Sequence, residues 1–293
     1  MAREAIENEK VQQIVSSTQD EAQQIDQIAK IRNWFKPENG SAYYPAIQSY
    51  VQGTTSLNDA LKTITTRVDE AISANKLSSM NWPDLWYSII HTSKRITYHD
   101  TSLHTKLVVL VQAIKQLPDP ASSDATKPFY SSLPDFSLAA REAYNDSPHY
   151  GSGNAASEIF AWANYNYFLA GLTASSVIDR SLYAIWALRA ALEDNHDGDV
   201  AGYDAYVPAA AVWVFALGKK LYDKEEDLTP SNPNMGNPAR GGELWTGGPE
   251  FSKKRWAFWG GRFRAVAGLE GVKDETKKVA KEAVEAMEKA EKD

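Results

Sequence analysis

Apolar residues recur along the chain at intervals of three and four positions, a spacing that places them on one face of an α-helix. The clearest stripe comprises Leu57, Leu61, Ile64, Val68 and Ile72. Ser56 precedes it and is suited to cap the N-terminus of the helix. Sustained alternation of apolar and polar residues, the sign of half-buried strands, is absent from the sequence. The pattern predicts an all-α fold, a single compact multi-helix array of about ten helices.

Several residues predict where helices begin. Pro45 suits a first helical turn, Asn81 is expected to cap a helix that carries Pro83, and Asn154 is expected to cap another. Thr18 and Glu21 have the spacing of a capping box, so the first segment is one helix or two. The run from 208 to 222 is apolar almost all round and predicts a central, buried helix.

Prolines interrupt the helical pattern near the middle of the chain. Residues 118–134 contain Pro118, Pro120, Pro128 and Pro134, which predicts a loop between two helical halves, 1–117 and 135–270. A charged helix follows at 273–293. Neither half shows a core pattern that closes alone, so we expect one helical domain over 1–293.

Composition and charge exclude several classes of function. The chain has 293 residues, of which 43% are hydrophobic and 24% charged, as in ordinary globular proteins. A net charge of -7 disfavours a nucleic-acid partner, and the absence of cysteine excludes thiol catalysis, thiolate metal sites and disulfides. No apolar run reaches the roughly 20 residues that span a bilayer, and no secretory signal is visible at the start. We expect a cytoplasmic protein with no membrane partner, and the nucleus stays an open alternative.

Three aromatic-rich blocks carry a resemblance to a known family. They are Ala187-Leu-Arg-Ala-Ala-Leu-Glu193, Pro208-Ala-Ala-Ala-Val-Trp213, and Gly241-Gly-Glu-Leu-Trp-Thr-Gly247 running into Phe251-Ser-Lys-Lys-Arg-Trp256. In order and spacing these blocks resemble the fungal domain-of-unknown-function family numbered 3632, over residues 180–265. The chain departs from the family pattern at Gly260-Gly261, where a kink or a close backbone contact is expected. The resemblance implies a fungal, intracellular, all-helical protein, and it brings no activity.

The segment 240–264 is dense in arginine and aromatic residues. Guanidinium groups bind phosphate or carboxylate, and aromatic rings stack on planar ligands. The candidate ligand-binding residues are Arg240, Trp245, Lys254, Arg255, Trp256, Trp259 and Arg262. The expected partner is a small anionic or aromatic ligand, or a protein. In the alternative interpretation the tryptophans are core residues and the arginines pair with Glu243 and Glu250.

An acidic loop between two helices has the spacing of a calcium-binding loop. The candidate metal ligands are Glu193, Asn195, Asp197, Asp199 and Asp204, and Gly198 occupies the sharp turn. Calcium prefers such oxygen ligands, but the first and last acidic residues depart from the usual template. A solvated acidic turn is the alternative. No cofactor other than calcium is suggested by the sequence.

The histidines and carboxylates form no recognisable catalytic constellation in the sequence. The leading hypothesis is therefore a non-catalytic helical domain that binds a ligand or a protein. A helical enzyme acting on a small organic substrate, in secondary or stress metabolism, is the alternative. A histidine or carboxylate with a perturbed pKa in a buried cavity would favour the enzyme. A third hypothesis makes the charged C-terminal helix an oligomerisation arm.

Overall fold

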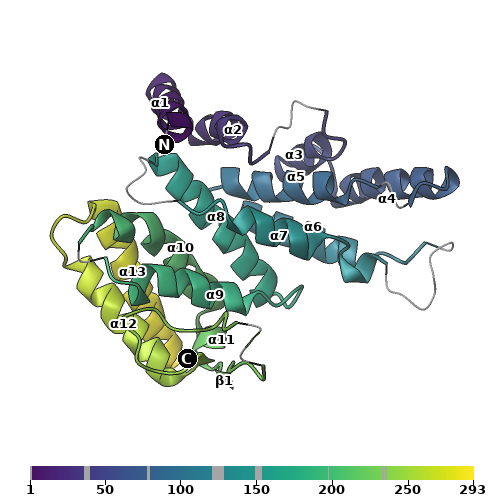
Figure 1. The fold of residues 1–293 in the computed structure, drawn as a ribbon. Helices are drawn as coiled ribbons and strands as arrows, with labels where there is room; N and C mark the ends of the chain where they lie inside the picture. Colours follow the sequence, from purple (N-terminus) through teal and green to yellow (C-terminus); the bar gives the residue numbers. More distant parts are fainter. Residues whose placement is uncertain are drawn as a thin grey trace. The chain divides into compact units, whose positions relative to one another are not determined.

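The expected all-α fold is confirmed in a computed structural model of the chain (Figure 1). The structure describes residues 2–35, 40–77, 80–120, 129–148, 154–196, 198–232, 234 and 236–293. The chain is divided into two compact units. The N-terminal unit is Ala5–Ser147, and the C-terminal unit runs from Pro148 to Asp293 and takes in the start of the chain. The boundary lies between Ser147 and Pro148, beyond the proline-rich segment 118–134, so residues 135–147 belong to the N-terminal unit. Of that segment, 121–128 lie outside the described residues.

As far as the chain is described, the N-terminal unit consists mainly of helices. They are α1 (Ala2–Ser17), α2 (Glu21–Arg32), α3 (Tyr44–Val51), α4 (Leu57–Ser73), α5 (Trp82–Arg95), α6 (Thr101–Lys115), the 3₁₀ turn Tyr130–Ser132 and α7 (Phe136–Tyr144). Helix α5 packs against α2, α3 and α7, and α6 packs against α4. Trp86 of α5 and Phe136 of α7 are fully buried, with ring centroids 5.1 Å apart.

Most of the expected helix starts are found in this unit. The Ser56 side chain accepts a hydrogen bond from the Asp59 N–H, Asn81 accepts one from the Asp84 N–H, and Pro45 lies in the first turn of α3. The start of α2 differs, because Asp20 rather than Thr18 caps it by accepting from the Gln23 N–H at 3.1 Å. Aspartate is as good a cap as threonine, and the two first helices are separate.

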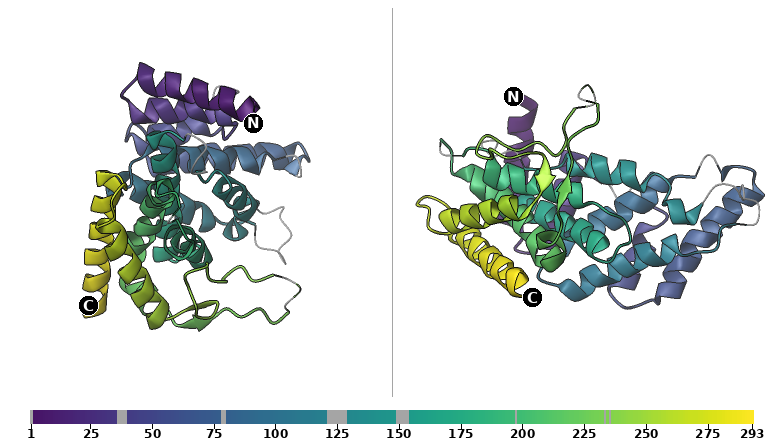
Figure 2. Two further views of the ribbon diagram at one scale, coloured as in Figure 1. Left: turned by 60° about the vertical axis from the view of Figure 1, so that its left-hand side comes forward. Right: turned by 90° about the horizontal axis from the view of Figure 1, so that it is seen from below.

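The C-terminal unit centres on two long, apolar helices. Its elements are α8 (Ala156–Ala174), α9 (Ser181–Leu188), a π-helical turn (Arg189–Glu193), α10 (Ala201–Leu217), α11 (Lys219–Tyr222), strands β1 (Glu226–Asp227) and β2 (Glu250–Phe251), α12 (Lys253–Ala267) and α13 (Asp274–Lys292). Helices α8 and α10 pack closely, and α13 lies against both α10 and α12. Figure 2 shows α12 and α13 side by side in both views. The strands pair in antiparallel register, with Glu226 opposite Phe251.

Two expected helix starts in this unit are corrected. Helix α10 begins at Ala201, so Pro208 lies inside it rather than at its first turn. A proline has no N–H to offer to Asp204 one turn earlier, yet burial of α10 on nearly all sides outweighs that loss. Helix α8 has Ala155, not Asn154, at its N-cap, and the Ala155 N–H donates to the Glu158 carboxylate at 2.9 Å.

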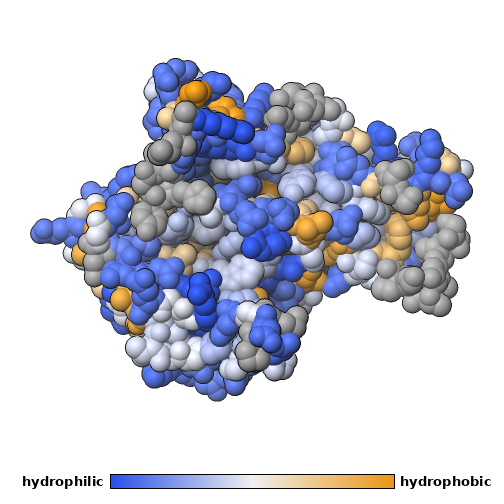
Figure 3. All heavy atoms as spheres, in the orientation of Figure 1, coloured by the Kyte–Doolittle hydropathy of each residue, from blue (hydrophilic) through white to orange (hydrophobic). Residues whose placement is uncertain are grey.

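The surface is mainly hydrophilic on the face shown in Figure 3, with hydrophobic residues in scattered spots. Among the described residues, Ile6 and Leu138 are the large hydrophobic side chains that stand exposed. In the same part of the chain, no helix combines the length and the apolarity needed to cross a membrane.

Candidate functional site

Glu193, the last residue of the π-helical turn, lies at the centre of a buried network. Its side chain and that of Arg255 are both 0% exposed. Arg255 donates from Nε to Oε1 at 2.7 Å and from Nη2 to Oε2 at 2.9 Å. The Trp259 indole N–H donates to Oε1 at 2.7 Å and the Gly242 N–H to Oε2 at 2.9 Å. The carboxylate thus receives four donors from two segments, helix α12 and the loop that contains Gly242.

The other N–H groups of Arg255 donate to main-chain carbonyls. Its Nη1 donates to Ala239 at 3.1 Å and to Glu250 at 2.9 Å, and its Nη2 donates to Arg240 at 3.4 Å. A guanidinium has five N–H groups, and Arg255 directs them all to acceptors of the protein. An external anion would therefore have to displace the Glu193 carboxylate.

Some of the other candidate ligand-binding residues lie together: the Trp245 ring has the Lys254 ammonium 5.7 Å and the Arg255 guanidinium 5.6 Å from its centre. The rest bond to separate partners. Trp256 is buried and donates to Glu291 of α13 at 2.9 Å, and Trp245 is buried and donates to the Gly248 carbonyl. Arg262 donates to the Leu192 carbonyl at 3.1 Å and to the Tyr203 hydroxyl at 2.8 Å. Arg240 and Lys254 are exposed.

The candidate calcium ligands are engaged in local structure. Glu193 is held by Arg255 and Trp259, Asp199 accepts from the Ala201 N–H at 3.1 Å, and Asp204 accepts from the Lys273 N–H at 3.1 Å. Asn195 has interactions of its own, and Asp197 lies outside the described residues. Where the chain is described, no three histidine, aspartate or glutamate side chains are grouped to hold a metal ion. Calcium at this loop would have to draw Glu193 away from Arg255.

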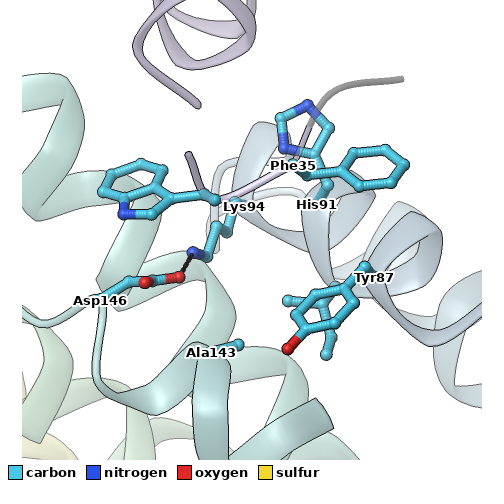
Figure 4. A pocket seen from close by; sticks show the side chains of 8 residues that line it. Phe35, Tyr87, His91, Lys94, Ala143 and Asp146 are labelled. Carbon is cyan, nitrogen blue, oxygen red and sulfur yellow. Dashed lines mark hydrogen bonds and ion pairs between the residues drawn. The ribbon is translucent and has the colours of Figure 1, made fainter. Parts of the chain in front are cut away.

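A small cavity of the N-terminal unit is lined by titratable side chains that sequence reasoning missed (Figure 4). Lys94 is 2% exposed, its ammonium lies 2.6 Å from Asp146 Oδ2, and it sits 4.2 Å from the centre of the Trp34 ring. His91 is 1% exposed, and its Nε2 lies 2.8 Å from Asp26 Oδ1. The signal in the sequence is weak, a histidine and a lysine three residues apart on an apolar helix face.

Burial lowers the pKa of both His91 and Lys94, and the neighbouring carboxylates Asp26 and Asp146 oppose that shift. Perturbed pKa values of this kind occur at catalytic sites and in structural ion pairs alike. The cavity has a volume of about 10 Å³, the room of about one water molecule. It holds reactive groups but leaves no space for an organic substrate.

A larger cleft lies in the C-terminal unit, between α8, α10 and the first turns of α13. Its volume is about 220 Å³. Ile159, Phe160, Pro208 and Val279 form apolar walls, and Asp204, Thr276, Lys273 and Glu275 supply polar groups. The interior proline of α10 thus becomes part of the wall.

Two of the polar side chains in this cleft are almost wholly buried. Asp204 is 8% exposed and Thr276 is 4% exposed. Within the described part of the chain, the Lys273 N–H is the hydrogen-bond donor to the Asp204 side chain, and the Thr276 hydroxyl has no hydrogen-bond partner. The second oxygen of Asp204 and the hydroxyl of Thr276 are open to solvent in the cleft, so both can form a hydrogen bond to a ligand that enters it.

The fold and this cleft define an all-helical protein with a ligand-sized apolar site. The family model for proteins of unknown function, DUF3632, matches residues 86–263, and the chain belongs to that family. The match starts at residue 86 rather than near 180, so it includes His91 and Lys94 but not Trp34 and Phe35, which also line their cavity. It extends past the Glu193–Arg255 network. It ends before α13, which supplies one wall of the cleft. No curated protein and no solved structure is significantly similar to the chain.

Proposed function

We propose that this protein is a non-catalytic binding protein for a small organic molecule, which it holds in the cleft between α8, α10 and α13. The observation that carries the proposal is an apolar cleft of about 220 Å³ with two buried, incompletely bonded polar side chains, Asp204 and Thr276. Sites for small molecules have this character, apolar walls with a few placed polar groups. Sites for drug-sized ligands run from roughly 300 to 1,000 Å³, so the ligand is smaller.

Catalysis is the alternative, and the depressed pKa values of His91 and Lys94 favour it. The volumes of the small cavity and of the cleft decide between catalysis and binding. A cavity of about 10 Å³ excludes any organic substrate unless Trp34 moves aside, whereas the cleft has room for one as it stands. Among its lining residues the cleft has no histidine and no nucleophile paired with a base, so binding is the function that it supports.

The proposal is tested with 2-phenylethanol, a probe with an aromatic body and one hydroxyl. At roughly 0.3 kcal/mol for each of its nine non-hydrogen atoms, this probe is expected to bind with a Kd of about 10 mM. Binding is followed by titration with ¹H–¹⁵N correlation spectra of the full chain. We expect saturable shifts at residues that line the cleft, such as Ile159 and Thr276.

A matched pair of variants tests whether the probe binds in the cleft. Ala156 is exposed at the edge of the cleft and Ala257 is exposed on α12. Ala156→Trp puts an indole at the mouth of the cleft and should abolish the saturable shifts, whereas Ala257→Trp should leave the Kd unchanged. Equal binding by both variants, or no saturation with the unaltered chain, would overturn the proposal.

A further inference from the structure

We infer that the ligand of the cleft is a small protonated amine with an apolar body. This inference rests on the proposed function and names the chemical class of its ligand. It follows from the kinds of hydrogen-bonding group that the cleft contains and from their burial.

The buried groups of the cleft call for a donor. A carboxylate accepts hydrogen bonds and cannot donate them. Asp204 is 8% exposed, and its Oδ1 accepts one described hydrogen bond, from the Lys273 N–H at 3.1 Å. Its Oδ2 has no donor among the described residues and is open to solvent in the cleft. A ligand that enters the cleft takes this charged oxygen out of water, which is costly unless the ligand donates a hydrogen bond to it.

An ammonium group fits this position better than a hydroxyl does. Hydrogen bonds between two charged groups are roughly twice as strong as neutral ones, and a positive charge compensates the buried negative charge of Asp204. An ammonium also has more than one N–H. A second can reach the Thr276 hydroxyl, which lies in the same first turn of α13 as the Asp204-bound Lys273 and is free to accept.

The charges around the cleft disfavour an anionic ligand. Asp204 and Glu275 carry negative charge, and Lys273 carries the opposing positive charge on an exposed side chain. The positive end of the α13 dipole would attract an anion, but Asp204 already occupies that end of the helix. The apolar walls, Ile159, Phe160 and Val279, then receive the hydrocarbon part of the amine.

The test compares three probes that share one carbon skeleton: 2-phenylethylamine, 2-phenylethanol and phenylacetate. Each is titrated against the full chain at pH 7 by the same spectra. We expect the amine to bind about tenfold more tightly than the alcohol, and the carboxylate to bind most weakly. The affinity of the amine alone should fall as salt is added.

Two variants link the preference to the named groups. Asp204→Asn keeps the shape of the side chain and removes its charge, so the amine should bind no better than the alcohol. Thr276→Val should weaken the amine several-fold, and it serves alone if Asp204→Asn does not fold. ¹H–¹⁵N spectra that match those of the parent away from the cleft show that each variant is folded.

The outcomes separate the two proposals. If the alcohol binds as tightly as the amine, or phenylacetate binds best, the amine inference is overturned while the cleft remains a ligand site. An amine preference that survives both substitutions also overturns it. If none of the three probes saturates, or Ala156→Trp leaves them all unaffected, the proposed function itself fails.

Discussion

At the scale of single residues, Glu193 and Arg255 form a fully buried ion pair in the C-terminal unit, and burying two charges is costly unless both are paired. Two charges without water contact are tolerated because each is fully hydrogen-bonded. Loss of one partner leaves the other charge buried and unpaired. Arg255→Met and Glu193→Gln should each lower the free energy of unfolding by about 3–5 kcal/mol.

The double variant should lose less than the sum of the two single losses, because it leaves no unpaired charge. Urea unfolding followed by tryptophan fluorescence measures all three variants. A loss below about 1 kcal/mol for Arg255→Met, the value typical of surface ion pairs, would mean that this arginine is solvated. It would then return as a candidate anion ligand.

Histidine burial makes the N-terminal unit sensitive to acid. Burial lowers the pKa of His104 to about 4, although its hydrogen bond to the Ile96 carbonyl and the nearby Asp100 raise the pKa. The folded state therefore binds fewer protons than the unfolded state between pH 6.5 and about 4, and stability falls as the pH falls through that range. From pH 7 to pH 5 the loss from His104 is about 2 kcal/mol.

His104→Gln removes that titration, so the variant should lose correspondingly less stability than the parent between pH 7 and pH 5. Urea midpoints at the two pH values give the comparison. His91 titrates in the same direction, because burial lowers its pKa also, and it remains in the variant. An unchanged pH dependence would show that His104 is hydrated in solution.

These residues also show why sequence predicts caps better than networks. Ser56 and Asn81 bond to groups three residues away, so the cap and its partner stand in one short segment. Glu193 and Arg255 are separated by 62 positions and meet only through the packing of α12 on the π-helical turn. The sequence showed both as charged residues and assigned them to different sites, a metal loop and an anion pocket.

At the scale of elements, glycines in a helix and in a loop have opposite roles. Gly261 lies in the interior of α12, exposed, with nothing within 4 Å of a Cβ placed there. A Cβ on Gly242 would lie 2.4 Å from Asp194 Oδ1 and 2.6 Å from the Glu193 carbonyl carbon. Gly261 therefore lowers the stability of α12 with no packing reason for a glycine. Gly242 is needed because only a residue without a Cβ lets the loop approach Glu193 so closely.

The two glycines give a matched prediction. Gly261→Ala should raise the free energy of unfolding by about 0.5–1 kcal/mol, because alanine favours a helix interior. Gly242→Ala should lower it by more than about 1 kcal/mol, because the added methyl overpacks the site and disturbs the Glu193 network. Thermal unfolding of both variants measures the contrast. A stabilised Gly242→Ala variant would contradict the close approach of the loop.

Helical periodicity predicts an element well where apolar residues recur regularly along one face, and less well where the helix is apolar all round or irregular. The alanine stripe of 273–293 became α13, whose Ala280, Ala283 and Ala290 are buried within the unit, and an oligomerisation arm would need another apolar face. The start of α10 was predicted at residue 208, where the apolar run begins, but the helix begins earlier, at Ala201. The π-helical turn has no sequence signature and is fixed by Arg262, Leu244 and His196, which bond its carbonyls.

At the scale of the whole molecule, the ligand cleft could not be found from sequence. Its walls come from residues near 156–160, 204–208 and 273–279, and none of these segments has a motif. The aromatic and arginine density of 240–264 was the stronger signal, but at its centre it marks a core in which Trp256, Trp259 and Arg255 are buried. Composition finds aromatic clusters, and only packing shows which side chains leave space beside them.

The division into two compact units predicts two unfolding transitions in the full chain, whereas a single helical domain, the expectation from sequence, would unfold in one. Leu110 in the N-terminal unit and Leu192 in the C-terminal unit are both 0% exposed. Leu110→Ala and Leu192→Ala should each lower the free energy of unfolding of their own unit by about 2–5 kcal/mol. Hydrogen exchange measured by mass spectrometry in increasing urea follows each unit through its own peptides. We expect Leu110→Ala to advance exchange only within 5–147 and Leu192→Ala only within 148–293. If either substitution advances exchange in both units equally, the chain unfolds as one domain.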